Sequence, residues 1–433
     1  MIIRILFTMA LLGTGAFSLF AQELTISPYS RYAIGDILSA TTTRNAAMGG
    51  ISVASDNYFS INRVNPASYG DIYFTTMDVS AFWQASQLST SQSTGTRYTA
   101  GIQNAAFAFP SNNNIVLTMG FSPYSSVGYE ITDRSPLIVG DSSYTQENTY
   151  SASGGLNQAF VGAAIRLFQR KLRIGVNAQY NFGNTQYTWR SIVYRRDSLL
   201  APEFFPLSTL QDVYVNGWIG TLGFIYEDTL SLAKRTTFRV GGMVDYTLGM
   251  DGDRFTQVSN GIVGDTLGGL ELGNVVVPPR FGLGFMVNRF AHWSIGADVK
   301  YQDWSKFQYF NENSDLGKDI RVSLGAEITP DVESPNYLKR IDYRVGGYYN
   351  QTYLRFDGKP VTDYGVTLGI GLPADAKGNS RFNRGRTVSR INISAELGRK
   401  GNLASDLPLQ ELYARVRIGA TINDRWFIRR VVD

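Results

Sequence analysis

Apolar and polar residues alternate along most of the chain after residue 70. In the segment 237–248, one face is apolar or glycine, and the other face carries Arg239 and Asp245. The same pattern occurs in 293–302, 320–328, 364–372, 390–397 and 412–423. Strict alternation over roughly eight to twelve residues indicates β-strands that have one apolar and one polar face. The strands are therefore expected to separate an apolar environment from a polar one.

These strands are long for a soluble protein. Several reach the roughly 9 to 11 residues that a tilted membrane strand needs, whereas strands of soluble proteins average about 5 or 6 residues. Aromatic residues lie near strand ends, as Trp293, Tyr301 and Trp304 do, and such girdles are typical of outer-membrane barrels. A charged side chain facing lipid costs about 2 to 4 kcal/mol at mid-bilayer. We therefore expect the charged face to line the lumen.

The pattern predicts an all-β fold, a transmembrane antiparallel barrel of fourteen strands. Their ranges are 71–84, 97–109, 113–130, 143–168, 171–187, 208–227, 235–249, 275–288, 291–303, 318–328, 340–354, 362–372, 388–398 and 409–423. Short connections follow even-numbered strands and long ones, such as 188–207 and 250–274, follow odd-numbered strands, as in barrels with short periplasmic turns and longer external loops. The segment 373–387 departs from this rule, because it is long where a periplasmic turn is expected.

The first residues predict export to the bacterial outer membrane. Arg4 precedes an apolar run from Ile5 to Phe20, and Ala21 is a small residue before Gln22. This is the pattern of a cleavable signal peptide, here residues 1–21. A retained membrane anchor is the alternative, but a run of about 16 residues is shorter than the roughly 20 that span a bilayer.

Composition narrows the classes of function. The chain has 25 Tyr, 25 Phe and 44 Gly but only 18% charged residues, and it has no long apolar helix, which suits a closed barrel. A net charge of +4 gives no reason to expect nucleic acid. The single His292 and the lack of Cys leave neither a Ser-His-Asp hydrolase nor a transition-metal site, and Asp251 and Asp253 lack the rest of a calcium loop. We predict no enzymatic activity, no metal and no cofactor.

Residues 22–70 do not alternate and are predicted to form a hatch inside the lumen of the barrel, which comprises residues 71–433. Small residues in this segment would let its backbone pack closely inside the barrel. The candidate hatch residues are Gly49, Gly50, Asp56, Asn65, Pro66 and Ala67. A periplasmic extension without a gating role is the alternative.

The inward face of the predicted strands carries charges of both signs. The candidate lumen residues are Arg239, Asp245, Asp298, Lys300, Arg321, Glu327, Arg344, Arg390, Glu396, Arg415 and Arg417. They could form ion pairs and hydrogen bonds that hold the hatch through Asp56 or Arg63, or they could simply solvate a channel wall.

The predicted external loop 188–207 contains an apolar cluster. Its members are Leu199, Leu200, Phe204, Phe205 and Leu207. Exposed apolar clusters often mark binding surfaces, so this loop is our candidate for the first capture of a hydrophobic ligand. Packing against a neighbouring loop at the rim is the alternative.

Three motifs resemble the long-chain fatty-acid transporter family of FadL-like barrels. They are the run from Ala46 through Met48-Gly49-Gly50 to Asn65-Pro66-Ala67, the segment 278–284 (PPRFGLG), and the segment 303–307 (DWSKF). The resemblance implies a fourteen-strand barrel with an N-terminal hatch that passes hydrophobic molecules sideways into the membrane. The segments 27–36 and 424–430 resemble the Bacteroidetes branch, in which relatives also serve type IX protein secretion as translocon accessories. The ending Val-Val-Asp differs from the terminal aromatic residue of most such barrels.

Two functions follow from these observations. The first is a passive FadL-like channel for fatty-acid-like molecules, with outer-membrane lipids and a hydrophobic small molecule as partners. The second is a non-transporting barrel that acts as a plug or shuttle on a type IX secretion translocon, and a purely structural barrel is a third. An apolar pocket continuous with a lateral gap would favour the first. A filled lumen with an exposed apolar patch beyond the lipid belt would favour the second.

Overall fold

The computed structural model describes residues 24–55, 58–111, 114–195, 198–202, 206–233, 235–260, 264–266, 269–310, 312–313, 315–374, 389–403 and 407–424. The predicted signal peptide, Asp56, Phe204, Phe205 and most of the segment 373–387 lie outside these ranges. No helix among the described residues is long and apolar enough to cross a membrane.

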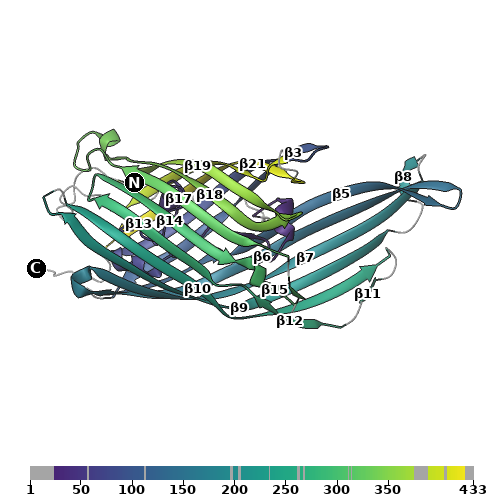
Figure 1. Cartoon of the computed structure of the whole chain (residues 1–433), viewed down its shortest axis with the longest axis horizontal. Helices are drawn as coiled ribbons and strands as arrows, with labels where there is room; N and C mark the ends of the chain where they lie inside the picture. The colour runs from purple at the N-terminus through teal and green to yellow at the C-terminus, as the bar shows by residue number, and fades with distance from the viewer. Residues whose placement is uncertain are drawn as a thin grey trace, which may run out of the picture.

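Fourteen antiparallel strands form a closed barrel (Figure 1). They are β2 (Thr75–Ser89), β3 (Thr94–Pro110), β4 (Ile115–Pro123), β6 (Ser142–Leu167), β7 (Leu172–Arg195), β9 (Leu207–Ser231), β10 (Thr236–Ser259), β13 (Arg280–Arg289), β14 (Trp293–Asp303), β17 (Lys318–Ile328), β18 (Asp342–Phe356), β19 (Lys359–Pro373), β20 (Arg390–Lys400) and β21 (Gln410–Asp424). Each strand pairs with the next in this order, and β21 pairs with β2 to close the ring. The fold class and strand number predicted from the alternation are confirmed.

The side chains of the wall alternate as the sequence predicts. On β10, Val240 and Leu248 are exposed on the outside, whereas Arg239 is fully buried on the lumen side. On β9, the aromatic residues Tyr214, Trp218 and Tyr226 are exposed on the outside of the wall.

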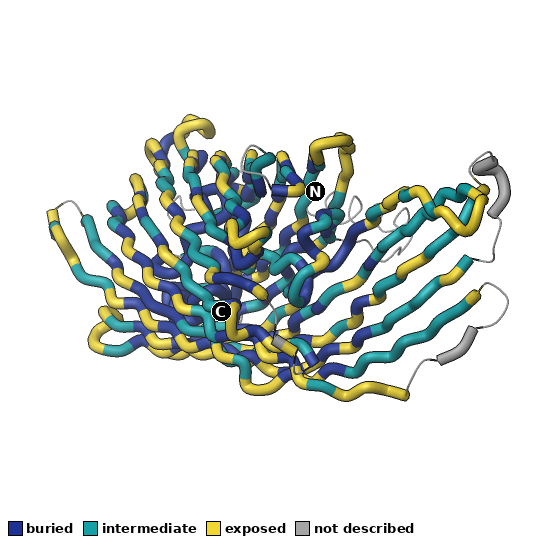
Figure 2. Tube along the Cα trace, turned by 45° about the vertical axis from the view of Figure 1, so that its right-hand side comes forward, coloured by how far each residue is buried: buried dark blue, intermediate teal, exposed yellow. Residues whose placement is uncertain are grey.

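Several neighbouring strands are much longer than a membrane requires. β6 and β9 contain 26 and 25 residues, whereas β14 and β17 contain 11 each. We call their external ends the external sheet: β5 (Ser125–Val139), residues 142–155 of β6, 183–195 of β7, 207–217 of β9, 247–259 of β10, and β12 (Glu271–Val276). At about 3.3 Å per residue, the extra residues extend the wall by roughly 45 Å along the strands. The external sheet projects from one side of the mouth (Figure 1, right) and is mostly half-buried or exposed (Figure 2).

Part of the external sheet occupies positions that the sequence predicts as loops, whereas residues 143–155 of β6 and 208–217 of β9 lie within predicted strands. Most of residues 188–207 and 250–274 continue β7, β9, β10 and β12. Likewise, the third predicted strand ends at residue 130, whereas β5 continues to Val139. The prediction fails here because these residues lie above the lipid, where neither face of a strand has to be apolar.

One interval of the wall lacks a ladder between neighbouring strands. β3 pairs with β4 only from Ala105 to Pro110, and beyond the bend at Tyr124 the chain continues as β5, which pairs with β6. Among the described residues, the part of β3 that precedes Ala105 forms no backbone ladder with β5. We call this unpaired interval between β3 and β5 the wall seam. β1 (Asp36–Ile37) lies at the wall seam, where it pairs with the start of β5.

The N-terminal segment runs through the lumen before β2 begins. We call residues 24–41 the upper hatch, which contains η1 (Pro28–Arg31) and β1. The lower hatch comprises the described residues of 42–71, with α2 (Thr43–Ala46) and η2 (Pro66–Asp71). β2 starts at Thr75, four residues after the predicted start, because Asp71 is the last residue of η2.

Candidate functional site: the hatch, the mouth and the wall seam

Caps and glycines set the local shape of the lower hatch. The side chain of Thr42 accepts a hydrogen bond from the Asn45 amide (3.2 Å), and that of Asn65 accepts one from the Ala67 amide (3.1 Å), so each begins a helical turn. Gly49 and Gly50 have φ values of 68° and 86°, which favour glycine. A Cβ on Gly49 would lie 2.5 Å from the carbonyl oxygen of Gly347, so no other residue fits without a shift of the wall.

The lower hatch packs directly on glycines of nine wall strands. At each of these glycines, a Cβ would lie 3.0 Å or less from a hatch atom. The nine, which we call the glycine seat, are Gly162, Gly175, Gly223, Gly241, Gly284, Gly325, Gly346, Gly369 and Gly419. For example, a Cβ on Gly346 would lie 2.2 Å from the amide nitrogen of Gly49. Such close contact of two backbones requires residues without side chains, so the wall and the lower hatch form one packed body.

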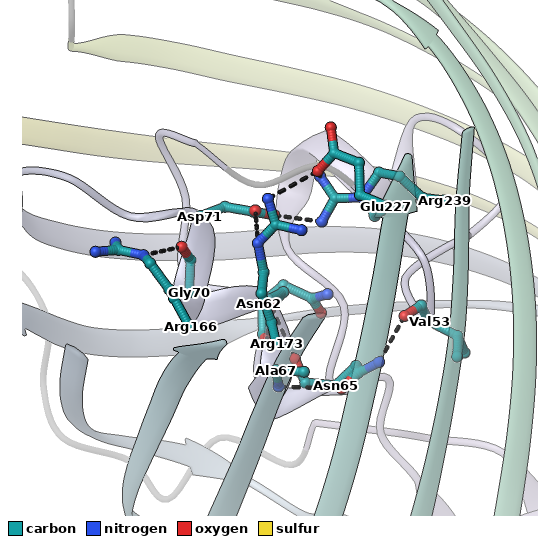
Figure 3. Close-up of polar contacts among 12 residues, drawn as sticks. Val53, Asn62, Asn65, Ala67, Gly70, Asp71, Arg166, Arg173, Glu227 and Arg239 are labelled. Carbon is teal, nitrogen blue, oxygen red and sulfur yellow. Dashed lines mark hydrogen bonds and ion pairs between the residues drawn. The ribbon is translucent and has the colours of Figure 1, made fainter. Parts of the chain in front are cut away.

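Buried ion pairs fix the periplasmic end of the hatch (Figure 3). Asp71 is fully buried between Arg239, whose Nη2 lies 2.6 Å from Oδ2, and Arg173, whose Nε lies 2.8 Å from Oδ1. The second contact has ion-pair distance but not hydrogen-bond alignment. Glu227 lies 2.7 Å from Nη2 of Arg173. The two carboxylates thus neutralise two buried guanidinium groups that come from different wall strands.

Backbone carbonyls of the hatch accept further hydrogen bonds (Figure 3). Nε of Arg166 donates to the carbonyl of Gly70 (2.5 Å), and Nδ2 of Asn65 donates to the carbonyl of Val53 (2.6 Å). The Asn65 amide also donates to the carbonyl of Phe224 on β9 (3.1 Å). Asn65 therefore links two turns of the hatch to the wall. These hydrogen bonds explain why an asparagine stands at the first position of the Asn-Pro-Ala sequence.

Five of the eleven candidate lumen residues form hydrogen bonds or ion pairs with the hatch, and Arg390 lies over the ring of Phe59 in the lower hatch. Oδ2 of Asp298 accepts from the Val53 amide (2.8 Å), and Nζ of Lys300 donates to Oγ of Ser52 (2.7 Å). The five contacts join Asp298 to Ser52 and Val53, Lys300 to Ser52, Glu327 to Arg44, Arg239 to Asp71, and Arg321 to the carbonyl of Gly49.

The other six candidate lumen residues interact with wall residues. Their contacts join Asp245 to Arg280, Arg344 to Glu327 and Asp342, Arg390 to Asp342, Glu396 to Arg417 and Tyr348, and Arg415 to Gln84. Charges of opposite sign thus alternate around the lumen, so the wall network holds its own shape as well as the hatch.

Arg63 and Tyr69 keep their ionisation states across the physiological pH range. Burial lowers the pKa of the Arg63 guanidinium to about 10, and burial raises the pKa of the Tyr69 phenol to about 12. Nη1 of Arg63 donates to Gln158 (2.7 Å), and the Tyr69 hydroxyl donates to Asn177 (3.0 Å). Since Arg63 stays charged and Tyr69 stays neutral near pH 7, these contacts do not change there.

The upper hatch is held by hydrogen bonds at the wall seam and by contacts on the opposite side of the mouth, where Ser27 donates to Glu411 (2.8 Å) and Tyr353 donates to the carbonyl of Gly35 (3.1 Å). Oγ of Ser30 accepts from the Gly128 amide (3.1 Å) and donates to the Gly128 carbonyl (3.2 Å). The Leu38 amide donates to the carbonyl of Tyr124 (2.9 Å), and Nζ of Lys400 donates to Asp36 (2.8 Å). None of the upper-hatch contacts with the seam rests on a buried ion pair like that of Asp71.

Apolar side chains of the chain itself fill the external mouth. Residues of the upper hatch pack there with residues from the strand ends and loops. The buried members are Tyr29, Ile34, Leu156, Val213, Val215, Ile219, Met250, Val275, Val277, Trp304, Phe307, Phe310, Leu316, Tyr353, Leu354, Val361, Leu407 and Leu409. This mouth cluster occupies the position in which an open barrel would bind an apolar ligand.

Two cavities lie beside the hatch, and charged side chains contribute to both linings. A cavity of about 250 Å³ between the two parts of the hatch is lined by residues that include Lys300, Arg321, Asp319 and Asp363. A smaller cavity of about 110 Å³ on the periplasmic side is lined by residues that include Arg344 and Asp342. The lining of the larger cavity is mainly polar and does not match the mostly apolar surface that hydrophobic ligands prefer, whereas the smaller cavity also has apolar side chains in its lining, among them Phe59 and Phe290.

The predicted capture loop falls only partly within the described residues. Leu207 begins β9 and is 47% exposed. Phe204 and Phe205 lie outside the described residues, as do the side chains of Leu199 and Leu200. Where the chain is described, no group of three His, Cys, Asp or Glu residues could hold a metal ion.

The sequence does not single out several residues that anchor the hatch. Arg44, Asp71 and Arg173 all form ion pairs between hatch and wall. Arg173 lies at a polar position of an alternating strand, a signal that could have been used, whereas Asp71 follows the hatch motif and is predicted as a strand residue. Of the two predicted anchors, Asp56 lies outside the described residues, and Arg63 donates to Gln158 of β6.

The fold and the hatch define the class of this protein: a closed fourteen-strand antiparallel barrel whose lumen holds an N-terminal hatch. The profile of the BamG family matches residues 1–433, and the chain belongs to that family. No curated protein sequence matches the chain.

Solved structures of transporters share the fold. The toluene transporter TodX of Pseudomonas putida has a TM-score of 0.56 at 15% identity, over 91% of this chain and 100% of that one. A FadL homologue of Pseudomonas aeruginosa has a TM-score of 0.55 at 11% identity, over 89% and 98%. The toluene transporter TbuX of Ralstonia pickettii has a TM-score of 0.54 at 13% identity, over 89% and 99%. At such identities the likeness establishes the fold alone.

Proposed function

We propose that this chain is a sealed outer-membrane barrel that acts as an accessory subunit and binds a partner protein at its external sheet. The observation that carries the proposal is the combination of a filled lumen with a wall that extends far beyond the lipid on one side. A secretion translocon, the partner class that the sequence resemblance implies, is the first candidate for that partner.

The filled lumen argues against a continuous path for solutes. The lower hatch packs on the glycine seat and is fixed by Asp71 between two buried arginines. Removing one partner of a buried ion pair costs about 3 to 5 kcal/mol, so opening this end would be expensive. Above it, the mouth cluster already buries the apolar surface that a ligand would use.

The external sheet supplies the binding surface. On its inner face, Ile131 lies opposite Tyr150, and Tyr150 lies opposite Trp189 with the rings stacked at 6.1 Å. Trp189 is 46% exposed, although Tyr187 of the same face packs on the mouth cluster. An aromatic face that continues a buried core and ends exposed suits a protein partner at the cell surface.

Shortening one hairpin tests the proposal. Glu130 and Ser151 lie opposite each other on β5 and β6, so replacing residues 131–150 by Asn-Gly would close a two-residue hairpin. We expect the wild type, in mild detergent, to carry a protein partner at a fixed ratio in native mass spectrometry, and the shortened variant to lose it. The matched control replaces residues 88–95 between the paired Gln87 and Thr96. A wild-type barrel that carries only a hydrophobic small molecule would contradict the proposal.

A lateral channel for hydrophobic molecules, fatty-acid-like ones included, is the second candidate. The wall seam favours it, because only non-covalent contacts of the upper hatch close this interval, and the solved structures of similar fold are described as toluene transporters. In this case the apolar loop around Leu207 would capture the ligand, and the upper hatch would move to release it into the membrane.

A disulfide across the wall seam separates the two candidates. Asp36 and Ser126 are direct partners in the β1–β5 ladder, a spacing that a disulfide can bridge, and the chain has no Cys. If the second candidate is right, the double substitution Asp36→Cys and Ser126→Cys should block toluene uptake into proteoliposomes until reductant is added. The first candidate predicts no uptake in either state.

A further inference from the structure

The outer edge of β5 is a strand edge without a partner over most of its length. β5 pairs with β6 from Val127↔Gly154 to Val139↔Ser142 without a register shift. On its other edge, β1 pairs with Ser125 and Ser126 only. Within the described residues, no strand continues this pairing along the rest of β5.

The contacts of Ser30 show which backbone groups face the wall seam. Because Ser30 bonds both the amide and the carbonyl of Gly128, and backbone groups alternate between the two edges of a strand, the even-numbered residues of β5 face the seam. Glu130, Thr132 and Arg134 therefore direct their amides and carbonyls toward it. Pro136 is the next even-numbered residue, and it has no amide to donate.

We propose that residues 130–134 of β5 accept an antiparallel strand from the partner protein, which continues the ladder that β1 begins. This inference deepens the proposed function and rests on it. Addition of a strand to a sheet edge provides affinity through main-chain hydrogen bonds and specificity through the side chains. Ser30 at one end and Pro136 at the other limit the accepting stretch to about five residues, which favours a short strand.

The side chains of this stretch specify the chemistry of the incoming strand. Glu130 and Arg134 share one face with Thr132 between them, and Ile131 lies on the aromatic inner face opposite Tyr150. Nε of Arg134 pairs with Glu147 of β6 (2.6 Å), but the Arg134 side chain is 64% exposed and can also bind a carboxylate on its other side. Opposite charges on directly opposed residues stabilise a pair of strands. The incoming strand should therefore read acidic, polar, polar, apolar, basic, with its acidic residue opposite Arg134 and its basic residue opposite Glu130.

A second copy of this chain does not fit the same edge. β5 rises out of the membrane in one direction, so two copies in one membrane would present parallel edges. Continuing the antiparallel ladder of β1 requires the opposite direction. The occupant is therefore a segment of a different protein that runs back toward the membrane.

Peptide binding to the purified, folded barrel tests the inference. The probe is a fluorescein-labelled peptide that contains Glu-Ser-Thr-Val-Lys, and the control peptide contains Lys-Ser-Thr-Val-Glu. We expect at least tenfold tighter binding of the first peptide in fluorescence polarisation. Thr132→Pro, which removes an amide that faces the seam, should weaken binding at least tenfold, whereas Thr132→Val, which like proline lacks the hydroxyl that contacts Thr149 but keeps the amide, should leave it unchanged. Equal affinity for both peptides, absence of binding, or indifference to Thr132→Pro would overturn the inference.

Hydrogen exchange gives a second test that needs no partner. In the free protein, the amides of Glu130, Thr132 and Arg134 should exchange at least tenfold faster than those of Ile131 and Asp133, which belong to the β5–β6 ladder. Equal protection of both sets would overturn the inference. If Thr132→Pro keeps the partner that the shortened hairpin loses, the edge site fails while the proposed function stands. If the shortened hairpin also keeps it, both fail.

Discussion

The lower and upper hatch belong to one segment but are held in different ways. The lower hatch touches glycines on nine strands and places Asp71 between two buried arginines. The upper hatch bonds the seam through Ser30 and a two-residue strand, β1. The difference indicates that the lower hatch is a permanent part of the barrel core. Any local opening should therefore begin in the upper hatch, at the wall seam.

Removal of the Asp71 carboxylate should produce the largest loss. Asp71→Ala leaves Arg173 and Arg239 buried without their main counter-charge, which costs about 3 to 5 kcal/mol. We expect a much lower urea midpoint, measured by the shift between folded and unfolded bands in gel electrophoresis. Asp228→Ala, which removes an exposed partner of Lys171, is the control and should leave the midpoint unchanged. Equal midpoints for the two variants would show that the buried cluster does not hold the hatch.

A side chain in the glycine seat should destabilise the barrel next most. In Gly346→Ala, the new Cβ would lie 2.2 Å from the Gly49 amide nitrogen, and such overpacking costs about 1 to 3 kcal/mol. Gly95→Ala is the control, because no atom lies within 4 Å of its Cβ. If both variants unfold at the wild-type urea concentration, the hatch backbone is not packed on the wall.

Loss of the Asp298 charge should have a smaller effect. Its carboxylate accepts the amides of Ser52 and Val53, and hydrogen bonds to a charged acceptor contribute about 1.5 to 3 kcal/mol. Asp298→Asn keeps the side-chain volume and one acceptor oxygen. We therefore expect the free energy of unfolding, measured in the same urea assay, to fall by an amount at or below the lower end of this range. Asp212→Asn, on the external sheet, should match the wild type. A larger loss than that of Asp71→Ala would reverse the order proposed here.

Removal of the Ser30 hydroxyl should have the smallest and most local effect. Ser30→Ala frees both backbone groups of Gly128 at the seam, and a single such contact contributes about 1 kcal/mol. We expect faster exchange of the Gly128 amide with an unchanged urea midpoint. Ser93→Ala at the β2–β3 turn is the control. A fall in global stability would place the upper hatch within the core.

The membrane part of the fold could be predicted because lipid imposes a simple pattern. Alternation around Arg239 and Arg417 gives both the strands and the direction of the charged face. The part of the external sheet that includes Thr132 escaped prediction, because such residues lie in water on the outer face, where no apolar pattern is required. Sequence can state that the chain is rich in glycine, but it cannot show that Gly175 and Gly346 lie under the same hatch.

The anchors of the hatch were only partly predictable. Asp298 and Glu327 stand out as charges on an alternating strand, and both contact the hatch. Asp71 carries no such pattern, because it lies in a short helical turn where its depth in the barrel cannot be inferred from its neighbours. The ion pair of Asp71 with Arg239 joins residues far apart in the chain, so it can be identified only from the three-dimensional structure of the closed barrel.

Hydrogen exchange of the hatch, followed by mass spectrometry in detergent, tests the central claim most directly. If the lower hatch is a permanent seal, the amides of Ser52, Val53 and Ala67 should exchange only with those of the barrel strands, while the upper hatch from Ser30 to Leu38 exchanges earlier through local opening. Exchange of the lower hatch before the barrel strands would show that the seal opens, and would favour a channel over an accessory barrel.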